Sequence, residues 1–137
     1  MISADLATYL RQDAYAHWLG ATIEAIEPGY SRVSLVVTES MLNFHGTTHG
    51  GIVFGLGDIA FAAASNSHGT TAVAINVSIS FLRATQIGDH LIAEAKEINL
   101  GGATALYEIT VTEKSSAQLI AKSQAMVYRK RENILVS

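Results

Sequence analysis

The second half of the chain alternates apolar and polar residues with a period of two. Beyond Gly69 the first run has its apolar residues at Val73, Ile75, Val77, Ile79 and Phe81, which predicts a strand with all five on one face. Three more strand-like runs cover residues 88–100, 103–113 and 118–130. Short turns at residues 101–102 and 115–116 join these last three runs, which predicts antiparallel neighbours. Runs of this length exceed the usual five or six residues or so and indicate a curved sheet.

The first 38 residues predict one short helix and one hairpin. Ser3 is a candidate N-cap, and one apolar stripe follows it at Leu6, Leu10, Ala14 and Trp18. Two strand-like runs, residues 21–27 and 30–38, lie on either side of a turn at Pro28 and Gly29. We therefore expect an amphipathic helix that leads into a β-hairpin.

Between these regions lies an apolar segment, residues 49 to about 67, with the sequence HGGIVFGLGDIAFAAASNS. It contains no proline, is rich in alanine and is apolar nearly all round, which is typical of a helix surrounded by protein. Gly51, Gly55 and Gly57 each lower helix propensity by about 1 kcal/mol relative to alanine, which predicts close approach of another element. The chain thus predicts a single α+β domain over residues 1–137, with a long central helix wrapped by a curved antiparallel β-sheet.

Composition narrows the function classes. Without cysteine the chain can form no disulfide, thiolate zinc site or iron–sulfur cluster, and a reducing cytoplasm is the expected compartment. A net charge of -3 gives no basic excess for a phosphate backbone, so we expect no nucleic-acid partner. No signal peptide is apparent, and no apolar stretch approaches the ~20 residues that span a bilayer, so no membrane partner is expected. A mean hydropathy of +0.27 in a small domain predicts self-association.

Asp58 is the only charged residue between His49 and His68, both counted as neutral. It falls in the middle of the segment that is predicted to be buried. Burial disfavours the charged form of a carboxyl group and raises its pKa, so such a residue is usually paired or functional. Asp58 could cap or bond a neighbouring backbone group, but it is also the first candidate for a catalytic carboxylate.

The start of the same helix, His49-Gly50-Gly51, is a second candidate feature. Free N–H groups and the positive end of the helix dipole meet there, and glycine lets a ligand oxygen approach the backbone. These are the properties of an oxyanion hole, although two glycines could simply form a tight corner.

Gly50 and Asp58 are eight residues apart, so their backbones lie roughly 12 Å apart along one helix. A reacting carbonyl must lie about 3 Å from both its donors and its base. If both features act on one carbonyl, they must come from two chains with antiparallel helices. The spacing therefore predicts a homodimer with two equivalent shared sites as the minimal active unit.

The motifs resemble a known family. The segment M-L-N-x-H-G-x-x-H-G-G covers residues 41–51, and D-x-A-F-A and N-S-x-G follow at residues 58–62 and 66–69. Together with F-L-R at 81–83 and Gly88-Asp89, they resemble the hotdog-fold acyl-CoA thioesterases of the PaaI type, from phenylacetate degradation, over about residues 20–128. The resemblance implies a cytoplasmic hydrolase, a homotetramer assembled from dimers, and a (hydroxy)phenylacetyl or similar aromatic acyl-CoA as substrate. It implies no metal and no cofactor, since coenzyme A is part of the substrate.

The resemblance also implies roles for individual residues. Asp58 would be the nucleophile or the general base, and the backbone N–H of Gly50 would polarise the thioester carbonyl. Asn43 and His49 would hold the substrate and the loop. Substrate-binding candidates are Gly51, at the helix start, and Arg83, which could meet the phosphates of coenzyme A.

One family feature is missing. Some related thioesterases carry a Ser or Thr on the strand after the helix that steadies the attacking water, and Ala74 stands at the aligned position. Asn76 or Ser78 could replace it. The residue that positions the water is left unassigned, as are the acyl group, the coenzyme A phosphate contacts and the choice between dimer and tetramer.

Three other functions were weighed. Hotdog hydratases or dehydratases of acyl thioesters carry a proline shortly after the catalytic histidine, whereas the sole proline here is Pro28. A non-catalytic acyl-CoA binding protein would usually carry an added DNA-binding segment. A metal site from His45, His49 and either His68 or Asp58 is disfavoured by the glycine and threonines between the first two.

Overall fold

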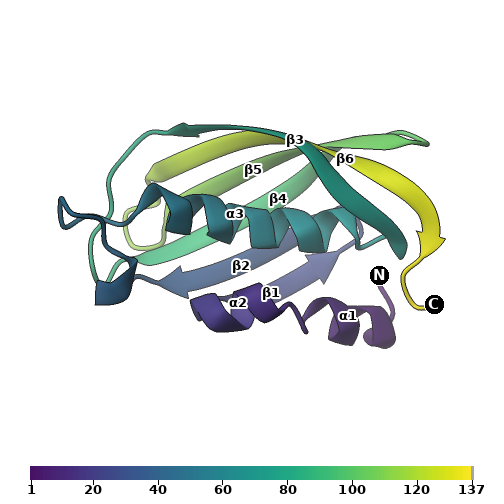
Figure 1. Ribbon diagram of the computed structural model, residues 1–137, viewed down its shortest axis with the longest axis horizontal. Helices are drawn as coiled ribbons and strands as arrows, with labels where there is room; N and C mark the ends of the chain where they lie inside the picture. The colour runs from purple at the N-terminus through teal and green to yellow at the C-terminus, as the bar shows by residue number, and fades with distance from the viewer. Residues whose placement is uncertain (137) are drawn as a thin grey trace.

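The computed structural model describes residues 1–136 and consists of one sheet curved around one long helix (Figure 1). The helices are α1 (Ala4–Leu10), α2 (Ala14–Leu19) and α3 (Gly50–Ser65), with a 3-10 turn at Glu39–Met41. The strands are β1 (Thr22–Glu27), β2 (Tyr30–Val36), β3 (Thr70–Phe81), β4 (His90–Leu100), β5 (Thr104–Glu113) and β6 (Leu119–Asn133). The predicted α+β architecture, with a central helix wrapped by an antiparallel sheet, is confirmed.

The sheet has six strands in the order β1-β2-β4-β5-β6-β3, so β1 and β3 form its edges. The predicted hairpins β1–β2, β4–β5 and β5–β6 are present and antiparallel. Strand β3 pairs with β6 rather than with β4, and residues 82–89 carry the chain back to β4. Thr85 anchors this connection beside the start of α3, because its carbonyl accepts the Thr48 N–H at 2.9 Å and the two hydroxyls lie 2.7 Å apart.

A register shift in residues 74–76 corrects the prediction that five apolar residues of β3 share one face. Val77 pairs with the buried Ala125, whereas Val73 pairs with the exposed Tyr128. Directly paired residues point to the same side of a sheet, so Val73 and Val77 lie on opposite faces. The prediction is therefore wrong for Val73, because the extra residue of a β-bulge changes the phase of the strand.

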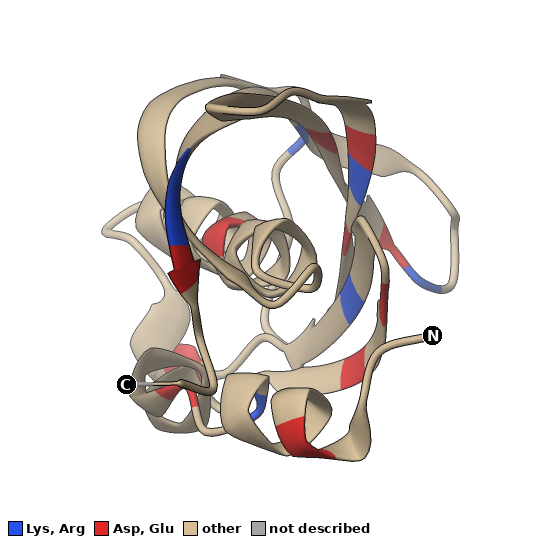
Figure 2. Ribbon diagram, turned by 90° about the vertical axis from the view of Figure 1, so that its right-hand side faces the viewer, with Lys and Arg blue, Asp and Glu red and all other residues tan. Residues whose placement is uncertain are grey.

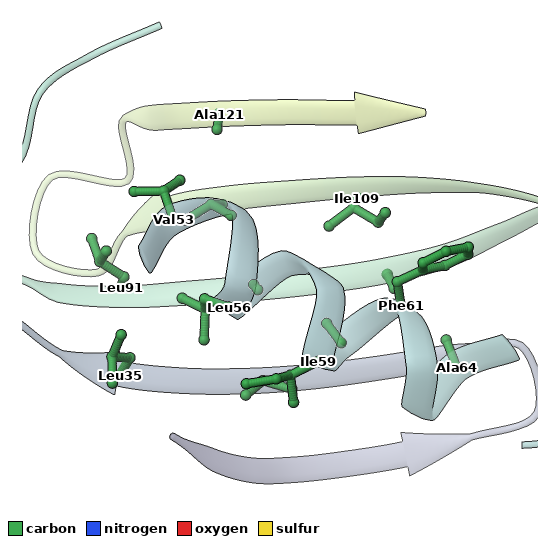
Figure 3. Close-up of a cluster of buried hydrophobic side chains, with 14 of the residues drawn as sticks. Leu35, Val53, Leu56, Ile59, Phe61, Ala64, Leu91, Ile109 and Ala121 are labelled. Carbon is green, nitrogen blue, oxygen red and sulfur yellow. The ribbon is translucent and has the colours of Figure 1, made fainter. Parts of the chain in front are cut away.

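Helix α3 supplies the centre of the hydrophobic core. Figure 3 shows its side chains Val53, Leu56, Ile59 and Phe61 directed toward Leu35, Leu91, Ile109 and Ala121 of the sheet. Burying side chains of this size stabilises the fold by roughly 1.5–3 kcal/mol each. Figure 2 views the molecule along α3 and shows the sheet curving around it, with α1 and α2 along its open side. Within residues 1–136 no helix is long and apolar enough to cross a membrane.

The close approach predicted by the helix glycines is present at two of them. A Cβ on Gly57 would lie 3.3 Å from Cγ2 of Ile109, so α3 packs tightly on β5 there. A Cβ on Gly55 would overlap the Tyr15 hydroxyl, so α2 rests directly on the helix backbone. The low helix propensity of these two glycines is thus offset by close packing of α2 and β5 on α3, which a larger side chain would prevent.

The predicted single N-terminal helix is two helices. Ser3 caps α1 as expected, with its hydroxyl accepting the Leu6 N–H at 3.2 Å. A second cap interrupts the helix at Asp13, whose carboxylate accepts the N–H groups of Tyr15 and Ala16. The break changes the helical phase, so the predicted stripe residue Trp18 is exposed and Ala16 and Leu19 are buried instead, with Ala14 also exposed.

Polar groups close the C-terminal end of α3. The Ser67 hydroxyl accepts the Gly29 N–H at 2.7 Å and donates to the Ala64 carbonyl at 2.6 Å. Glu97 accepts a hydrogen bond from the buried Tyr107 hydroxyl at 2.9 Å and lies 2.6 Å from Nε2 of His68. Burial and the Glu97 carboxylate both raise the pKa of Tyr107, so it remains a neutral donor.

Candidate active site

One stripe of α3 is open to solvent in the single chain. The sequence predicted a helix surrounded by protein on all sides, and this is wrong for the single chain. Four residues on one face are exposed: Gly51, Phe54, Asp58 and Ala62. Their spacing of three or four residues places them in one row. Phe54 is 38% exposed, although a phenylalanine of a central helix would ordinarily be buried. The stripe is a surface that a second molecule could cover.

Asp58 lies within this stripe and is the only acidic residue of α3. Its carboxyl group reaches solvent but is flanked by protein, and this desolvation raises its pKa above the ordinary aspartate value. The negative charge of Asp13 raises the pKa further. Asp58 makes no side-chain hydrogen bond within residues 1–136, so its oxygens are available to accept a proton from a substrate or a water.

His49 organises the start of α3. Its Nδ1 accepts the N–H of Gly51 at 2.8 Å, which makes it the N-cap residue and places the proton of the neutral ring on Nε2. The Gly51 N–H is therefore already bonded to His49 in the single chain. Within residues 1–136 the Gly50 N–H has no hydrogen-bond partner, which leaves it free at the positive end of the helix dipole.

Asn43 shapes the loop before this helix. Its side-chain oxygen accepts the N–H groups of His45 at 2.9 Å and Thr47 at 3.2 Å. Its backbone N–H donates to the Thr47 carbonyl at 2.8 Å. These bonds fix the turn that leads into His49, so in this structure Asn43 holds the loop and makes no contact with Asp58.

Gly50 and Arg83 line one surface pocket. The pocket has a volume of about 310 Å³ and is also lined by Thr48, Phe81 and Thr85. A backbone donor at the helix start thus shares a cavity with a cationic side chain from the loop after β3. Such a combination can accept a ligand with a carbonyl oxygen at one end and anionic groups at the other.

Within one chain Asp58 and Gly50 do not meet. Both belong to α3, and the eight residues between them correspond to roughly 12 Å of helix. The structure therefore gathers Gly50, Gly51, His49 and Arg83 at one end of the helix and leaves Asp58 two turns away.

The two polar residues of β3 that the sequence suggested as partners of Asp58 do not face α3. Asn76 pairs with Met126 and Ser78 pairs with Gln124, in the opposite phase to the buried Ala125, so both face away from α3. Ala74 pairs with the buried Val127 and faces inward. The two residues that the sequence suggested as substitutes for a water-holding hydroxyl are thus on the wrong face of the sheet.

The structure adds one residue that the sequence analysis missed. Ser123 of β6 pairs with Ile79 and Ile109 on the inner face, and it shares a small cavity with Asp58. Its sequence position carried a signal, since it is the polar member of the buried alternation Ala121, Ser123, Ala125 and Val127.

A larger pocket lies beside the C-terminal half of α3. It has a volume of about 460 Å³ and is lined by residues of α1, of the link between α1 and α2, and of the end of α3, among them Tyr9, Asp13, Ile59, Ala62 and the following Asn66. Ile59 and Ala62 are one residue and one turn beyond Asp58, so the pocket lies along the part of the helix that follows the carboxylate. Within residues 1–136 no three His, Cys, Asp or Glu side chains are placed to hold a metal ion.

Comparisons with known proteins place the chain in a family. The model of the thioesterase superfamily matches residues 45–120, more than half of the chain. An Archaeoglobus fulgidus protein provisionally named an esterase is 46% identical over 123 residues, 90% of this chain and 79% of that protein. Acyl-coenzyme A thioesterase PaaI of Escherichia coli is 42% identical over 102 residues, 74% of this chain and 73% of its own length.

Solved structures give the same result. The structure of E. coli PaaI, from the phenylacetic acid degradation operon, superimposes with a TM-score of 0.87 at 37% identity and covers 93% of this chain and 91% of that one. A Streptococcus mutans protein bound to acetyl-CoA superimposes with a TM-score of 0.79 at 28% identity, covering 82% of this chain and 90% of that one. The chain therefore belongs to the thioesterase superfamily, as a hotdog-fold enzyme of the PaaI type.

Proposed function

We propose that this protein hydrolyses acyl-CoA thioesters to a free acid and coenzyme A. The observation that carries the proposal is the presence on α3 of two unbonded groups, the Asp58 carboxylate on the exposed stripe and the Gly50 N–H at the helix start. The named activity of E. coli PaaI and the acetyl-CoA bound to the S. mutans protein support the substrate class.

The proposed active unit is a homodimer, with a homotetramer as the expected assembly. The exposed stripe of α3 borders the edge strand β3, because Phe54 and Asp58 share a cavity with Val77. Strand β3 also exposes 55% of Ile75 and 54% of Phe81. A two-fold axis beside β3 would cover these apolar groups. If the two α3 helices run antiparallel, Asp58 of one protomer would face Gly50 of the partner subunit. Within one chain the two residues are roughly 12 Å apart, too far to act on one carbonyl, so a shared site needs two chains.

In the proposed mechanism the carbonyl oxygen of the thioester accepts the N–H of Gly50 of the partner subunit. This donor stabilises the negative charge that develops on the oxygen in the transition state. Asp58 acts as the nucleophile or as the general base for water, and the thiolate of coenzyme A leaves. His49 holds the helix start through Gly51, and Asn43 holds the loop before it. The reaction needs no metal and no cofactor beyond the coenzyme A of the substrate.

The two pockets support an orientation of the substrate with coenzyme A near Arg83 and the acyl group near Asp58. Arg83 in the pocket beside Gly50 would face the phosphates of coenzyme A. The pocket of about 460 Å³ beside Asp58 would take the acyl group, and its volume suits an aromatic group such as phenylacetyl or hydroxyphenylacetyl. The proposal thus includes a role in phenylacetate degradation in the cytoplasm, where a chain without cysteine loses no disulfide.

A panel of acyl-CoA substrates tests the proposal, with detection of the free thiol. We expect thiol release from phenylacetyl-CoA and related aromatic thioesters, and a dimer or tetramer by light scattering. Absence of thiol release across the panel, or a fully active monomer, would contradict the proposal. Consumption of a 2-enoyl-CoA without thiol release would point to a hydratase instead.

A further inference from the structure

The inner surface of the sheet next to Asp58 is almost wholly apolar. From β3 it presents Ala74 and Val77, and from β5 it presents Ile109. A carboxylate that activates water needs a second group to hold that water, because one hydrogen bond leaves the oxygen free to rotate away from the carbonyl. On β3, Asn76 and Ser78 face outward, so neither can supply this group from the inner surface of the sheet.

Ser123 lies where a second group could hold the water beside Asp58. It lies on β6, the neighbour of β3, and pairs with Ile79 on one side and Ile109 on the other. Together with Asp58 it lines a cavity of about 10 Å³ whose other walls include Phe61 and Val77. Asp58 and Ser123 are the polar side chains of that cavity.

Ser123 is only 7% exposed and lines the cavity that it shares with Asp58. A buried hydroxyl normally has a partner, either protein or water. A cavity of about 10 Å³ is the smallest that admits one water molecule, and a water needs at least two polar partners. The carboxylate and the hydroxyl supply those two.

We propose that Ser123 is a positioning residue that holds the attacking water against Asp58, in place of the missing hydroxyl on β3. This inference rests on the proposed thioesterase function and selects the general-base route for it. The Ser123 hydroxyl and the Asp58 carboxylate bind one water between them. Asp58 removes a proton from that water while the water oxygen bonds to the acyl carbon. The carbon–sulfur bond then breaks, the sulfur leaves with its electron pair, and the proton passes from Asp58 to the coenzyme A thiolate.

Substitution of Ser123 by alanine tests the role in the full-length protein, with the best acyl-CoA of the panel as substrate. We expect kcat to fall about tenfold, the value of one lost hydrogen bond, while KM changes less than about twofold. The acid limb of the pH profile should keep its midpoint, because Asp58 is untouched and only the plateau falls. A purely structural role would lower the unfolding temperature and leave kcat per folded site unchanged, and that result would overturn the proposal.

Two serine controls lie nearby. Ser78→Ala removes a hydroxyl from the outer face of β3 and should leave kcat unchanged. Ser31→Ala removes a buried hydroxyl that bonds the Ala60 carbonyl on the other side of α3, so it should lower stability but not kcat. A loss of kcat in Ser78→Ala equal to that in Ser123→Ala would contradict the assignment.

A crystal structure of the wild-type protein gives a test that does not depend on folding of a variant. We expect one ordered water within about 3.2 Å of both the Ser123 hydroxyl and the Asp58 carboxylate. An empty or collapsed cavity at high resolution would overturn the inference. If Ser123→Ala keeps full activity while Asp58→Asn loses it, the water-holding role fails and the thioesterase function stands. If wild type releases no thiol, the function itself fails.

Discussion

The two ends of α3 differ in how far their polar groups are satisfied. At the C-terminal end, Ser67 bonds to backbone groups of the β1–β2 turn and of α3 itself, and Glu97 joins His68 and Tyr107. At the N-terminal end and along the exposed stripe, the Gly50 N–H and the Asp58 carboxylate have no partner within residues 1–136. Both ends carry polar residues on the same apolar helix, so residue type alone does not separate structure from function.

The difference separates the polar groups that hold the fold from the groups that the proposed reaction would use. A satisfied group contributes to stability, and its loss leaves a partner unpaired. An unsatisfied group contributes little to the single chain and has a use only when something else meets it. Substitutions at the C-terminal end of α3, the closed end, should therefore lower the stability of the fold. Substitutions at the N-terminal end and along the exposed stripe should lower the rate of catalysis.

The largest effect is expected from Asp58→Asn. The amide cannot accept the proton of water or attack the carbonyl, so kcat should fall about a thousandfold. Because the surroundings raise the pKa of Asp58, its charged form is disfavoured in the folded state, and the neutral amide should not lower the unfolding temperature. Thiol release and thermal unfolding measure the two quantities. Substantial residual turnover would remove Asp58 from the mechanism.

The next effect is expected from Gly50→Pro, which removes the free N–H. Gly50 is the first residue of α3, where proline is tolerated, and His49 has the extended backbone that precedes proline, with φ -60° and ψ 137°. We expect kcat to fall about a hundredfold with the helix retained. Gly50→Ala is the matched control, since its Cβ would lie 3.5 Å from Phe81 and its N–H remains. Equal activity of the two variants would exclude the N–H as the carbonyl donor.

Arg83→Gln should raise KM for the acyl-CoA by about tenfold and leave kcat nearly unchanged, because the side chain is proposed to bind the phosphates. The same acyl group on pantetheine, which lacks the nucleotide, should show no such difference between variant and wild type. An equal rise in KM for both substrates would place Arg83 near the acyl or pantetheine part instead.

At the closed end, Glu97→Ala should lower the free energy of unfolding by about 1–3 kcal/mol, because it leaves the buried Tyr107 hydroxyl without its acceptor. kcat per folded site should not change. Glu108→Ala, which breaks an exposed ion pair with Lys122, is the control and should cost less than about 1 kcal/mol. A fall in kcat for Glu97→Ala would show that the two ends of the helix are not independent.

The smallest effect is a shift in pH dependence. The charge of Asp13 raises the pKa of Asp58, so Asp13→Asn should lower that pKa and move the acid limb of kcat/KM to lower pH. Asparagine also caps helices well, so α2 should remain. Asp5→Asn in the first turn of α1 is the control and should leave the profile in place. A shift to higher pH would contradict the electrostatic account of Asp58.

Much of the fold was predictable from the sequence, because local patterns of residues decide where the strands and helices form. The period-two runs predicted the strands, the apolar alanine-rich segment predicted α3 nearly to its ends, and the lone charge of that segment identified Asp58. Three features were not predictable, because they depend on contacts between distant segments. These are the placement of β3 beside β6, the bulge that turns Val73 outward, and the pairing that brings Ser123 to Asp58. The exposed stripe of α3 also differs from the full burial that its apolar sequence predicted. A partner chain that covers the stripe would account for the difference.

The most direct test of the shared site is complementation between two inactive variants. Asp58→Asn subunits are mixed with Gly50→Pro subunits under conditions that exchange protomers. Each mixed dimer would then hold one intact site, formed by Asp58 of the second variant and Gly50 of the first. With random pairing, half of the dimers are mixed, so the account predicts activity of about a quarter of wild type. Activity that stays at the average of the two separate variants after exchange would contradict a site built across the dimer.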